Sequence, residues 1–492
     1  MKKWILIPLS LLAFTAFHSC NPDNLDVQPI AITEDVFFST EQEFDQAVLA
    51  TYQKLLFFYN YRGGGYIHGI WLLPDDDATT QGGSPFEIFS GIQATDGGVN
   101  FFFTNLYQLI QRANVVLLKQ EQRGDVAYKN TTLRNTHRGE ALFLRGYANY
   151  LLWNYFGTAP LVTERIVDID DAYLTNTSGT QLLDQAIADF KAAAPLLPVA
   201  WDDANLGRVT ANSALGMAGK ALIIRASATN SNADYSEALG LLNQISNRAL
   251  VADFGDNFDE KKENNDESLF EIQLGLNVSN NVWLNNDAFA VVGDLGGFYG
   301  FFDNHWSLFG APVYTATPGL QSLYEPGDPR IDQTFSGNSI KKYVSRPRGS
   351  GNPDYWNNAR VLRYADVLLL KAEALIATNG SVSEAINLVN QVRTRARNMG
   401  TTGAPADRDV NATDRNQVMQ WIMDERRMEL AFEDGARWID LRRMHLGGKI
   451  DLNTWDFGSV RTDFDFEEKN LYLPIPSSEL ELNTNLRQND GF

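Results

Sequence analysis

Residues 366–398 are DVLLLKAEALIATNGSVSEAINLVNQVRTRARN, and they carry the pattern of a complete helix hairpin. The apolar residues of the first half fall on one helical face until Asn379-Gly380 supplies a stop signal. Ser381, followed three residues later by Glu384, fits a capping box for a second helix. The segment therefore predicts two helices joined by a short turn.

Helical spacing of apolar residues marks four stretches of the chain. They are residues 41–58, 104–156, 180–228 and 363–445. Small residues stand where paired helices would cross, among them Ala141, Ala148, Ala214, Ala221, Ala372 and Ala385. Close packing of this kind is typical of tetratricopeptide hairpins, although no strict period of about 34 residues is present.

Two blocks, residues 59–103 and 229–360, lack this pattern and are rich in glycine, asparagine and aromatic residues. Loops of such length in a compact domain are usually functional or flexible. We therefore predict a mainly α fold. Divergent tetratricopeptide-like helix hairpins form one side, and a loop-rich region with short strands forms the other. Residues 41–492 are predicted to be a single domain.

The N-terminus has the architecture of a signal peptide. Met1-Lys2-Lys3 is positive and residues 4–17 are apolar, but this run is too short to span a bilayer as a finished helix. It leads to Cys20, the only cysteine in the chain, which therefore cannot form an intramolecular disulfide. Cleavage by an ordinary signal peptidase would make Cys20 incidental, whereas a lipoprotein peptidase would leave it acylated. We favour the lipid anchor, with residues 1–19 as signal peptide and 20–40 as tether and docking segment.

Acidic side chains outnumber basic ones by 61 to 41. Loss of Lys2 and Lys3 with the leader changes the formal net charge from −20 to −22. Such a chain is repelled by nucleic acid and by anionic lipid, so nucleic-acid binding is a poor hypothesis. No later stretch is long and apolar enough for a transmembrane helix, so membrane contact is expected through the N-terminus.

No spacing in the chain is typical of a metal or cofactor site. The five histidines are far apart, and no phosphate loop, dinucleotide fingerprint or nucleophile elbow is present. Asp75-Asp76-Asp77 offers oxygen ligands for calcium but lacks the spaced ligand set of a calcium loop. We predict a solvated acidic turn there, no metal site and no cofactor.

Six distinctive sequence segments follow one another in a recognisable order along almost the whole chain. They are NLD at 24–26 with a phenylalanine pair at 37–38, GEALFLRGYANYLLWNYFGTAPLV at 139–162, GRVT at 207–210, RYADVLLLKAEA at 363–374, ERRMELAFEDGARWIDLRR at 425–443, and LYLPIPSSEL with NLRQNDGF at 471–492. In these segments the chain resembles the SusD/RagB family, the surface lipoproteins of Bacteroidota nutrient-uptake systems. Asp490 and Phe492 stand where that family usually has proline and tyrosine.

The resemblance implies a mostly helical single domain with four tetratricopeptide-like hairpins. It also implies a non-catalytic glycan-binding protein, anchored by lipid to the outer membrane and facing outward. Such a protein delivers oligosaccharide or polysaccharide to a SusC-like TonB-dependent transporter, its partner in the membrane. Neither periodicity nor charge indicates this function.

The charged residues of the last two helical segments are predicted to be structural. Glu433 and Arg437 are four residues apart, and Arg437 and Asp440 three apart, so these pairs face each other wherever the backbone stays helical. Asp434-Gly435 interrupts the segment, so the first pair could cross a turn instead. Arg363 and Asp366 receive the same structural interpretation.

Sugar rings are usually held on loops by aromatic platforms and by amide, carboxylate and arginine side chains. Both loop blocks contain these residue types. Our candidates for glycan binding are Trp71, Asn100, Tyr299 and Trp306. The alternative for each ring is that it anchors a long loop to the core.

Two other functions stay open at this point. An exported glycoside hydrolase needs two carboxylates about 5–9 Å apart, and Glu425 with Glu429 is one pair on a single helical face. A helical-repeat scaffold would bind only other proteins. The identity of the glycan, or of a peptide in its place, is not decided by these patterns.

Overall fold

The structure is a computed structural model in which most residues are helical and the strands are few and short. It describes residues 36–59, 67–80, 82–274, 299, 302, 314–344, 357–458 and 461–492. This confirms the predicted mainly α class.

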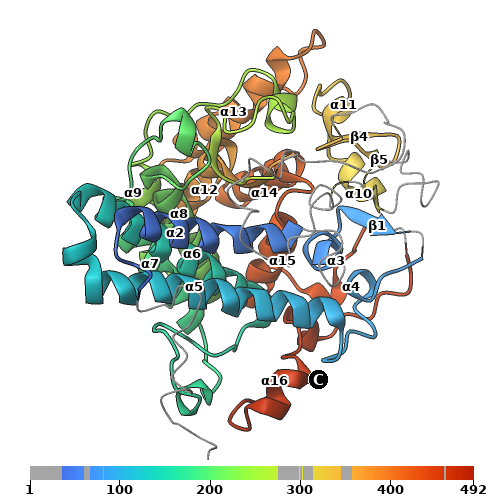
Figure 1. The fold of residues 1–492 in the computed structure, drawn as a ribbon. Helices are drawn as coiled ribbons and strands as arrows, with labels where there is room; N and C mark the ends of the chain where they lie inside the picture. Colours follow the sequence, from blue (N-terminus) through green and yellow to red (C-terminus); the bar gives the residue numbers. More distant parts are fainter. Residues whose placement is uncertain are drawn as a thin grey trace, which may run out of the picture.

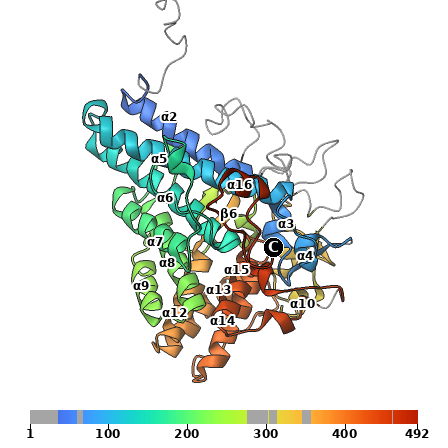
Figure 2. The same cartoon turned by 90° about the horizontal axis from the view of Figure 1, so that it is seen from below.

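One side of the molecule is a stack of helices, seen from its edge in Figure 2. The stack contains α2 (Glu41–Tyr52), α5 (Gly97–Ala127), α6 (Thr131–Phe156), α7 (Gln181–Ala193), α8 (Ala211–Thr229), α9 (Asn232–Leu242), α12 (Tyr364–Ala377), α13 (Val382–Asn398) and α14 (Arg415–Leu430). From α5 to α9 each helix contacts the next one in the chain, and α9 then packs against α12. Short connections and close packing are what hairpin repeats require.

The hairpin of α12 and α13 forms as predicted. Asn379 adopts a left-handed conformation (φ 58°), and the Gly380 amide donates to the Leu375 carbonyl at 2.7 Å, which closes the first helix. The Ser381 hydroxyl accepts from the Glu384 amide at 3.2 Å and caps the second helix.

Two helices lie partly or wholly where loops were predicted. Helix α5 begins at Gly97, because the Asp96 carboxylate accepts from the Gly98 and Val99 amides and outweighs the glycine pair. Helix α9 lies within block 229–360, capped by Ser231. Both expectations were wrong because capping and tertiary packing override a short, glycine-containing pattern.

The other side of the molecule carries short strands and short helices (Figure 1). Its antiparallel sheet has the order β1 (Ala78–Thr80), β3 (Tyr314–Ala316), β5 (Ser339–Ile340), β4 (Phe335–Ser336). Around it lie α3 (Ile67–Leu72), α4 (Pro85–Ile88), α10 (Pro318–Gln321) and α11 (Ile331–Thr334). The predicted loop-rich side with short strands is confirmed.

Helix α15 (Ala436–Leu446) lies between the two sides (Figures 1 and 2). It begins after Gly435, whose φ is +63° and where a Cβ would stand 2.5 Å from the Tyr155 hydroxyl. Only glycine fits that position. A second pair of strands, β2 (Ser268–Ile272) and β6 (Ala359–Arg363), leads into α12, and α16 (Ser477–Leu482) lies near the C-terminus. Among the described residues, no helix combines the length and apolar character needed to cross a bilayer.

Candidate functional site

Aromatic side chains gather where the longest segments of the loop side begin and end. Tyr299 stacks on Tyr343 with ring centroids 4.0 Å apart and an interplanar angle of 10°. Phe302 lies 6.5 Å from Tyr314 and 6.0 Å from Phe432, which belongs to the turn between α14 and α15. We call these five residues, together with Tyr59, the loop-base cluster.

Tyr59 joins the cluster through that same turn. Its hydroxyl donates to Asp434 at 2.6 Å, and its ring stacks on Trp71 at 5.8 Å. Burial raises the pKa of Asp434 to about 7, although nearby Lys220 and the hydrogen bond from Tyr59 favour its charged form. A carboxyl group that titrates near neutrality therefore lies directly beneath the loop side.

Four segments begin or end at this cluster. Residues 60–66 follow Tyr59, residues 275–298 precede Tyr299, residues 303–313 join Phe302 to Tyr314, and residues 345–356 come soon after Tyr343. The described residues that flank these segments therefore lie together in the core, although they are distant in sequence.

The predicted glycan-binding residues fall in different environments. Trp71 is 1% exposed and packs on Tyr155 and Phe102, and Tyr299 is 2% exposed, so both rings serve as core anchors in this conformation. Asn100 is half-buried in the first turn of α5, where its Oδ1 accepts from Ser478 at 3.4 Å. Trp306 and Cys20 lie outside the described residues. The structure thus does not bring Trp71, Asn100 and Tyr299 to one exposed surface.

The acidic trio is buried, so the predicted solvated turn was wrong. Asp76 accepts from Arg437 at 2.6 and 2.9 Å, and Asp77 accepts from Arg427 at 2.6 Å. Burial opposes ionisation of Asp76, but the two arginines outweigh it and lower its pKa. Burial and the neighbouring aspartates raise the pKa of Asp75. The trio thus attaches the segment before β1 to α14 and α15.

A buried ion-pair network fills the space between α12, α14 and α15. Arg363 donates to Glu433 at 2.7 Å and to Glu267 and Glu429 at 2.6 Å each. In a second group Arg426 binds Asp366 at 2.6 Å and Asp440 at 2.9 Å. These buried carboxylates are compensated by arginines from other elements, as such groups must be.

Arg437 pairs with Asp76, whereas the sequence spacing predicted that Glu433 and Asp440 would be its partners. Phe432, Asp434 and Gly435 all have positive φ, so the chain turns sharply between α14 and α15 and Glu433 does not share a helix with Arg437. Asp440 instead accepts from Arg443 at 2.8 Å as well as from Arg426. The sequence indicated the interruption at Asp434-Gly435, but helical spacing could not identify Asp76 as the partner of Arg437.

Glu425 and Glu429, the alternative acid–base pair, belong to the same network. Arg330 donates to both, at 2.7 and 2.9 Å, and Glu425 also accepts from Arg393 at 2.7 Å. Both carboxylates are fully buried. They are charge-paired and closed to substrate, so this pair does not form a hydrolase site in this conformation.

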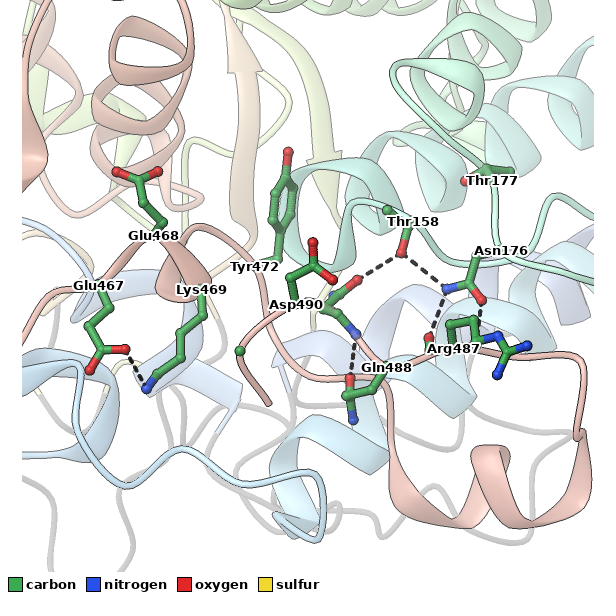
Figure 3. A pocket seen from close by; sticks show the side chains of 12 residues that line it. Thr158, Asn176, Thr177, Glu467, Glu468, Lys469, Tyr472, Arg487, Gln488 and Asp490 are labelled. Atoms are coloured by element: carbon green, nitrogen blue, oxygen red, sulfur yellow. Dashed lines mark hydrogen bonds and ion pairs between the residues drawn. The ribbon is translucent and has the colours of Figure 1, made fainter.

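A separate cavity of about 650 Å³ lies where the C-terminal residues meet the segment after α6 (Figure 3). Asn489 lies in its wall, where it donates to the Phe156 and Leu473 carbonyls at 2.9 and 2.7 Å and accepts from Thr158 at 2.7 Å. Asn176 binds the backbone of Arg487 in both directions. These amides hold the wall together, while the charged side chains of Arg487 and Asp490 stand at its edge.

The loop-base cluster was missed because its members look like ordinary core residues in the sequence. Tyr343 and Phe432 both have a positive φ of 63°, and the neighbouring sequence does not indicate this conformation. The one available signal was position, since Tyr59, Tyr299, Phe302 and Tyr314 flank glycine- and asparagine-rich segments. That signal favours the anchoring interpretation of loop aromatics.

Two family models match the chain. The model described as "SusD family" matches residues 313–492, and the one described as "Starch-binding associating with outer membrane" matches residues 77–222. SusD-like protein P2 of Formosa agariphila is 25% identical over 541 aligned residues, which cover 100% of this chain and 99% of that protein.

Solved structures share the fold over nearly the whole length. A SusD homolog from Bacteroides thetaiotaomicron has a TM-score of 0.76 at 20% identity and covers 94% of this chain and 99% of its own. A laminarin binding SusD-like protein has a TM-score of 0.70 at 23% identity and covers 92% of this chain and 100% of its own. These likenesses show the shared fold, and the two family models, which together match residues 77–222 and 313–492, show that the chain belongs to the SusD family.

Proposed function

We propose that this protein is a non-catalytic, lipid-anchored glycan-binding protein of the outer membrane, which delivers oligosaccharide or polysaccharide to a TonB-dependent transporter. The observation that carries the proposal is the loop-base cluster. In it, described residues that flank four aromatic- and amide-bearing segments of the sequence lie together in the core. Binding sites usually lie on loops held by such a rigid scaffold.

The composition of those segments suits sugar binding. They contain Tyr66, Trp283, Trp306 and Trp356, together with the amides Asn285 and Asn286. Aromatic faces pack on the apolar faces of sugar rings, and amides bind their hydroxyl groups. The family description "starch-binding" and the laminarin-binding neighbour support a glycan as the ligand.

The burial of the charged network supports a non-catalytic role. General acid–base catalysis requires a carboxyl group within reach of the substrate. Glu425 and Glu429 are instead enclosed by arginines. Incubation of the protein with soluble glycans should therefore release no reducing ends over time, and a steady release would contradict this part of the proposal.

Glycan binding is tested with the mature protein, residues 21–492, by calorimetry against a panel of soluble glucans, plant glycans and host glycans. Trp306→Ala should weaken binding to the ligand found by about tenfold or more, as loss of a stacking platform does at binding hot spots. Tyr173→Ala is the matched control, because this aromatic residue is 43% exposed and lies on the segment between α6 and α7. Absence of binding to every glycan would refute the proposal.

Anchoring and delivery need separate tests. Labelling with a palmitate analogue should mark the wild-type protein and not Cys20→Ser. Purification of the labelled protein from native membranes in mild detergent should retain a TonB-dependent transporter. A Cys20→Ser protein that still carries lipid would contradict the anchor, and wild-type protein purified without a transporter would contradict delivery.

A further inference from the structure

A cavity of about 510 Å³ lies between α2 and α5, two helices that pack against each other at the edge of the stack (Figure 2). Apolar side chains form most of its lining, namely Phe37, Ala47 and Ala50 of α2, and Val115 and Val116 of α5. All of these except Val116 are only half-buried, so the cavity opens to the surface. Apolar side chains left uncovered together mark a place where another segment binds.

The described part of the chain begins at the rim of this cavity. Val36 is its first residue and is 62% exposed, and the adjacent Phe37 lines the cavity. Phe38 then holds the chain on the body, because its ring is 4% exposed and packs on Phe44 at 5.0 Å. Residues 21–35, which precede Val36 in the mature chain, therefore start within reach of the cavity.

The residues just before Val36 have side chains that suit an apolar cavity. The sequence at 29–35 is PIAITED, with Ile30 and Ile32 two positions apart. In an extended chain both isoleucines point to the same side, so they can enter one cavity together. The six residues 30–35 extend to at most about 20 Å, whereas the stretch of α2 from Gln46 to Ala50 rises only about 6 Å. The segment is therefore long enough to cover the cavity.

Charge favours the same segment. Arg112 is the only charged residue among the described residues that line the cavity. It donates to the Ala50 carbonyl, and a guanidinium carries five N–H donors, so it can also bind a carboxylate. Glu34 and Asp35 stand directly after the apolar pair. A second copy of the body is a poorer occupant, because two chains of formal charge −22 repel each other.

We propose that residues 29–35 of the mature N-terminal segment bind in the cavity between α2 and α5. Ile30 and Ile32 occupy the cavity, and the carboxylates of Glu34 and Asp35 lie at Arg112. The segment that connects the body to its N-terminus is then a bound strap over half of its length.

Binding of the strap shortens the free part of the tether. Only the eight residues 21–28 remain, and they reach at most about 27 Å, instead of about 50 Å for all fifteen. The body is thereby kept close to the anchor, with the face of α2 and α5 nearest to it. This consequence rests on the proposed lipid anchor, whereas binding of the strap does not.

Cysteine pairs test the binding in the mature protein, residues 21–492, which contains no native cysteine. Ile32→Cys combined with Ala47→Cys or Ala50→Cys should form a disulfide on mild oxidation, because docking brings the two thiols within bonding distance. Ile32→Cys with Gln42→Cys is the matched control, since Gln42 is exposed on the same helix and does not line the cavity.

The control pair separates a bound strap from a free tether. A free tether closes the shorter loop to position 42 at least as fast as the longer loops to positions 47 and 50. Docking should instead make at least one cavity pair form about tenfold faster than the control pair, because it raises the local concentration of the thiol.

Substitutions within the tether form a second arm, and they leave the folded body unaltered. In the faster cavity pair, Ile30→Ser should slow disulfide formation about tenfold, because a buried apolar side chain is lost, whereas Leu25→Ser outside the strap should not.

Glu34→Gln with Asp35→Asn should also slow it, and the loss should be larger at low salt than at high salt. Asp23→Asn with Asp26→Asn is the matched control, because it removes the same number of charges outside the strap.

Equal rates for the cavity pairs and the control pair, or no effect of Ile30→Ser, would overturn the proposal. Disulfide-linked dimers on a non-reducing gel would overturn it as well, because the cavity would then hold the tether of a second copy. Palmitate labelling of the wild-type chain is measured independently of these rates, so failure of the strap and failure of the proposed anchor are distinguishable.

Discussion

Arg363 stands where β6 becomes α12, and three buried carboxylates depend on it. It is 1% exposed and donates to Glu267, Glu429 and Glu433. Arg363→Met keeps the bulk but removes the one cation shared by all three carboxylates, which then retain only Arg330, Arg395 and Lys342 as cationic partners. We expect the free energy of unfolding in urea to fall by about 3–5 kcal/mol. Arg397→Met is the control, since Arg397 and its partner Asp407 are 24% and 52% exposed and the pair should contribute less than about 1 kcal/mol. Equal losses in the two variants would contradict this account.

Asp434 is the opposite case, because the favourable contacts of its buried carboxylate do not fully offset the cost of burying the charge. Its pKa rises to about 7, against about 3.9 in an unfolded chain. The folded state then binds the extra proton between these values, so stability falls as pH rises from about 4 to 7. Asp434→Asn keeps an acceptor for the Tyr59 hydroxyl and removes this penalty.

We expect Asp434→Asn to raise the free energy of unfolding by roughly 4 kcal/mol at pH 8 and to change it little at pH 3. Urea titrations at the two pH values measure this difference. A gain of the same size at both would assign the effect to packing instead of charge. Glycan binding should persist, because the Asp434 side chain is buried and bonded to Tyr59.

At the scale of elements, the C-terminal residues clasp the segment after α6 through asparagine side chains. Asn489 is 8% exposed and satisfies the Phe156 and Leu473 carbonyls. Asn489→Ala leaves both buried carbonyls without this donor, and we expect a loss of about 2–3 kcal/mol measured by thermal unfolding. Asn485→Ala, on the exposed part of the same clasp, should cost less than about 1 kcal/mol. A larger loss for Asn485→Ala would contradict the clasp.

The elements also show what the sequence could and could not reveal. The hairpin of α12 and α13 was predictable because its stop and cap are local, at Asn379-Gly380 and Ser381. The start of α5 was not predictable. The glycine pair at its first two positions resembles a turn, but Asp96 caps the helix there. Whether Asp76 is solvated or buried depends on Arg427 and Arg437, which lie about 350 positions away. No local pattern reports such a contact.

The same limit applies to the candidate site. Composition correctly indicated where aromatic residues are abundant, yet exposure of a ring is decided by its neighbours. Trp71 is enclosed by Tyr59, Phe102 and Tyr155. Local sequence therefore predicts which segments form the loop side, whereas the fold decides which of their rings anchor it.

At the scale of the whole molecule, two opposing sets of carboxyl groups determine how stability depends on pH. In Asp440 burial opposes ionisation, but Arg426 and Arg443 outweigh it and lower the pKa; Arg363 and Lys342 do the same for Glu433. Such groups stabilise the fold above their unfolded pKa of about 4, and this contribution is lost as pH falls below it. Burial raises the pKa of Asp434 to about 7 and that of Glu263 to about 8, so these two acids destabilise the fold as pH rises from about 4 to 8.

Stability therefore falls at low pH, where the paired carboxylates take up protons, and falls again as the pH rises, where Asp434 and Glu263 lose theirs. We expect maximal stability of the mature protein near pH 5 and a decline toward pH 8. Self-repulsion of a chain with formal charge −22 acts in the same direction. Urea midpoints measured from pH 3 to 9 test this profile. Asp434→Asn combined with Glu263→Gln should flatten the decline above pH 5 and leave the acid limb, which depends on Asp440 and Glu433, unchanged. An optimum above pH 7 in the wild type would show that the arginine-paired carboxylates alone dominate the titration.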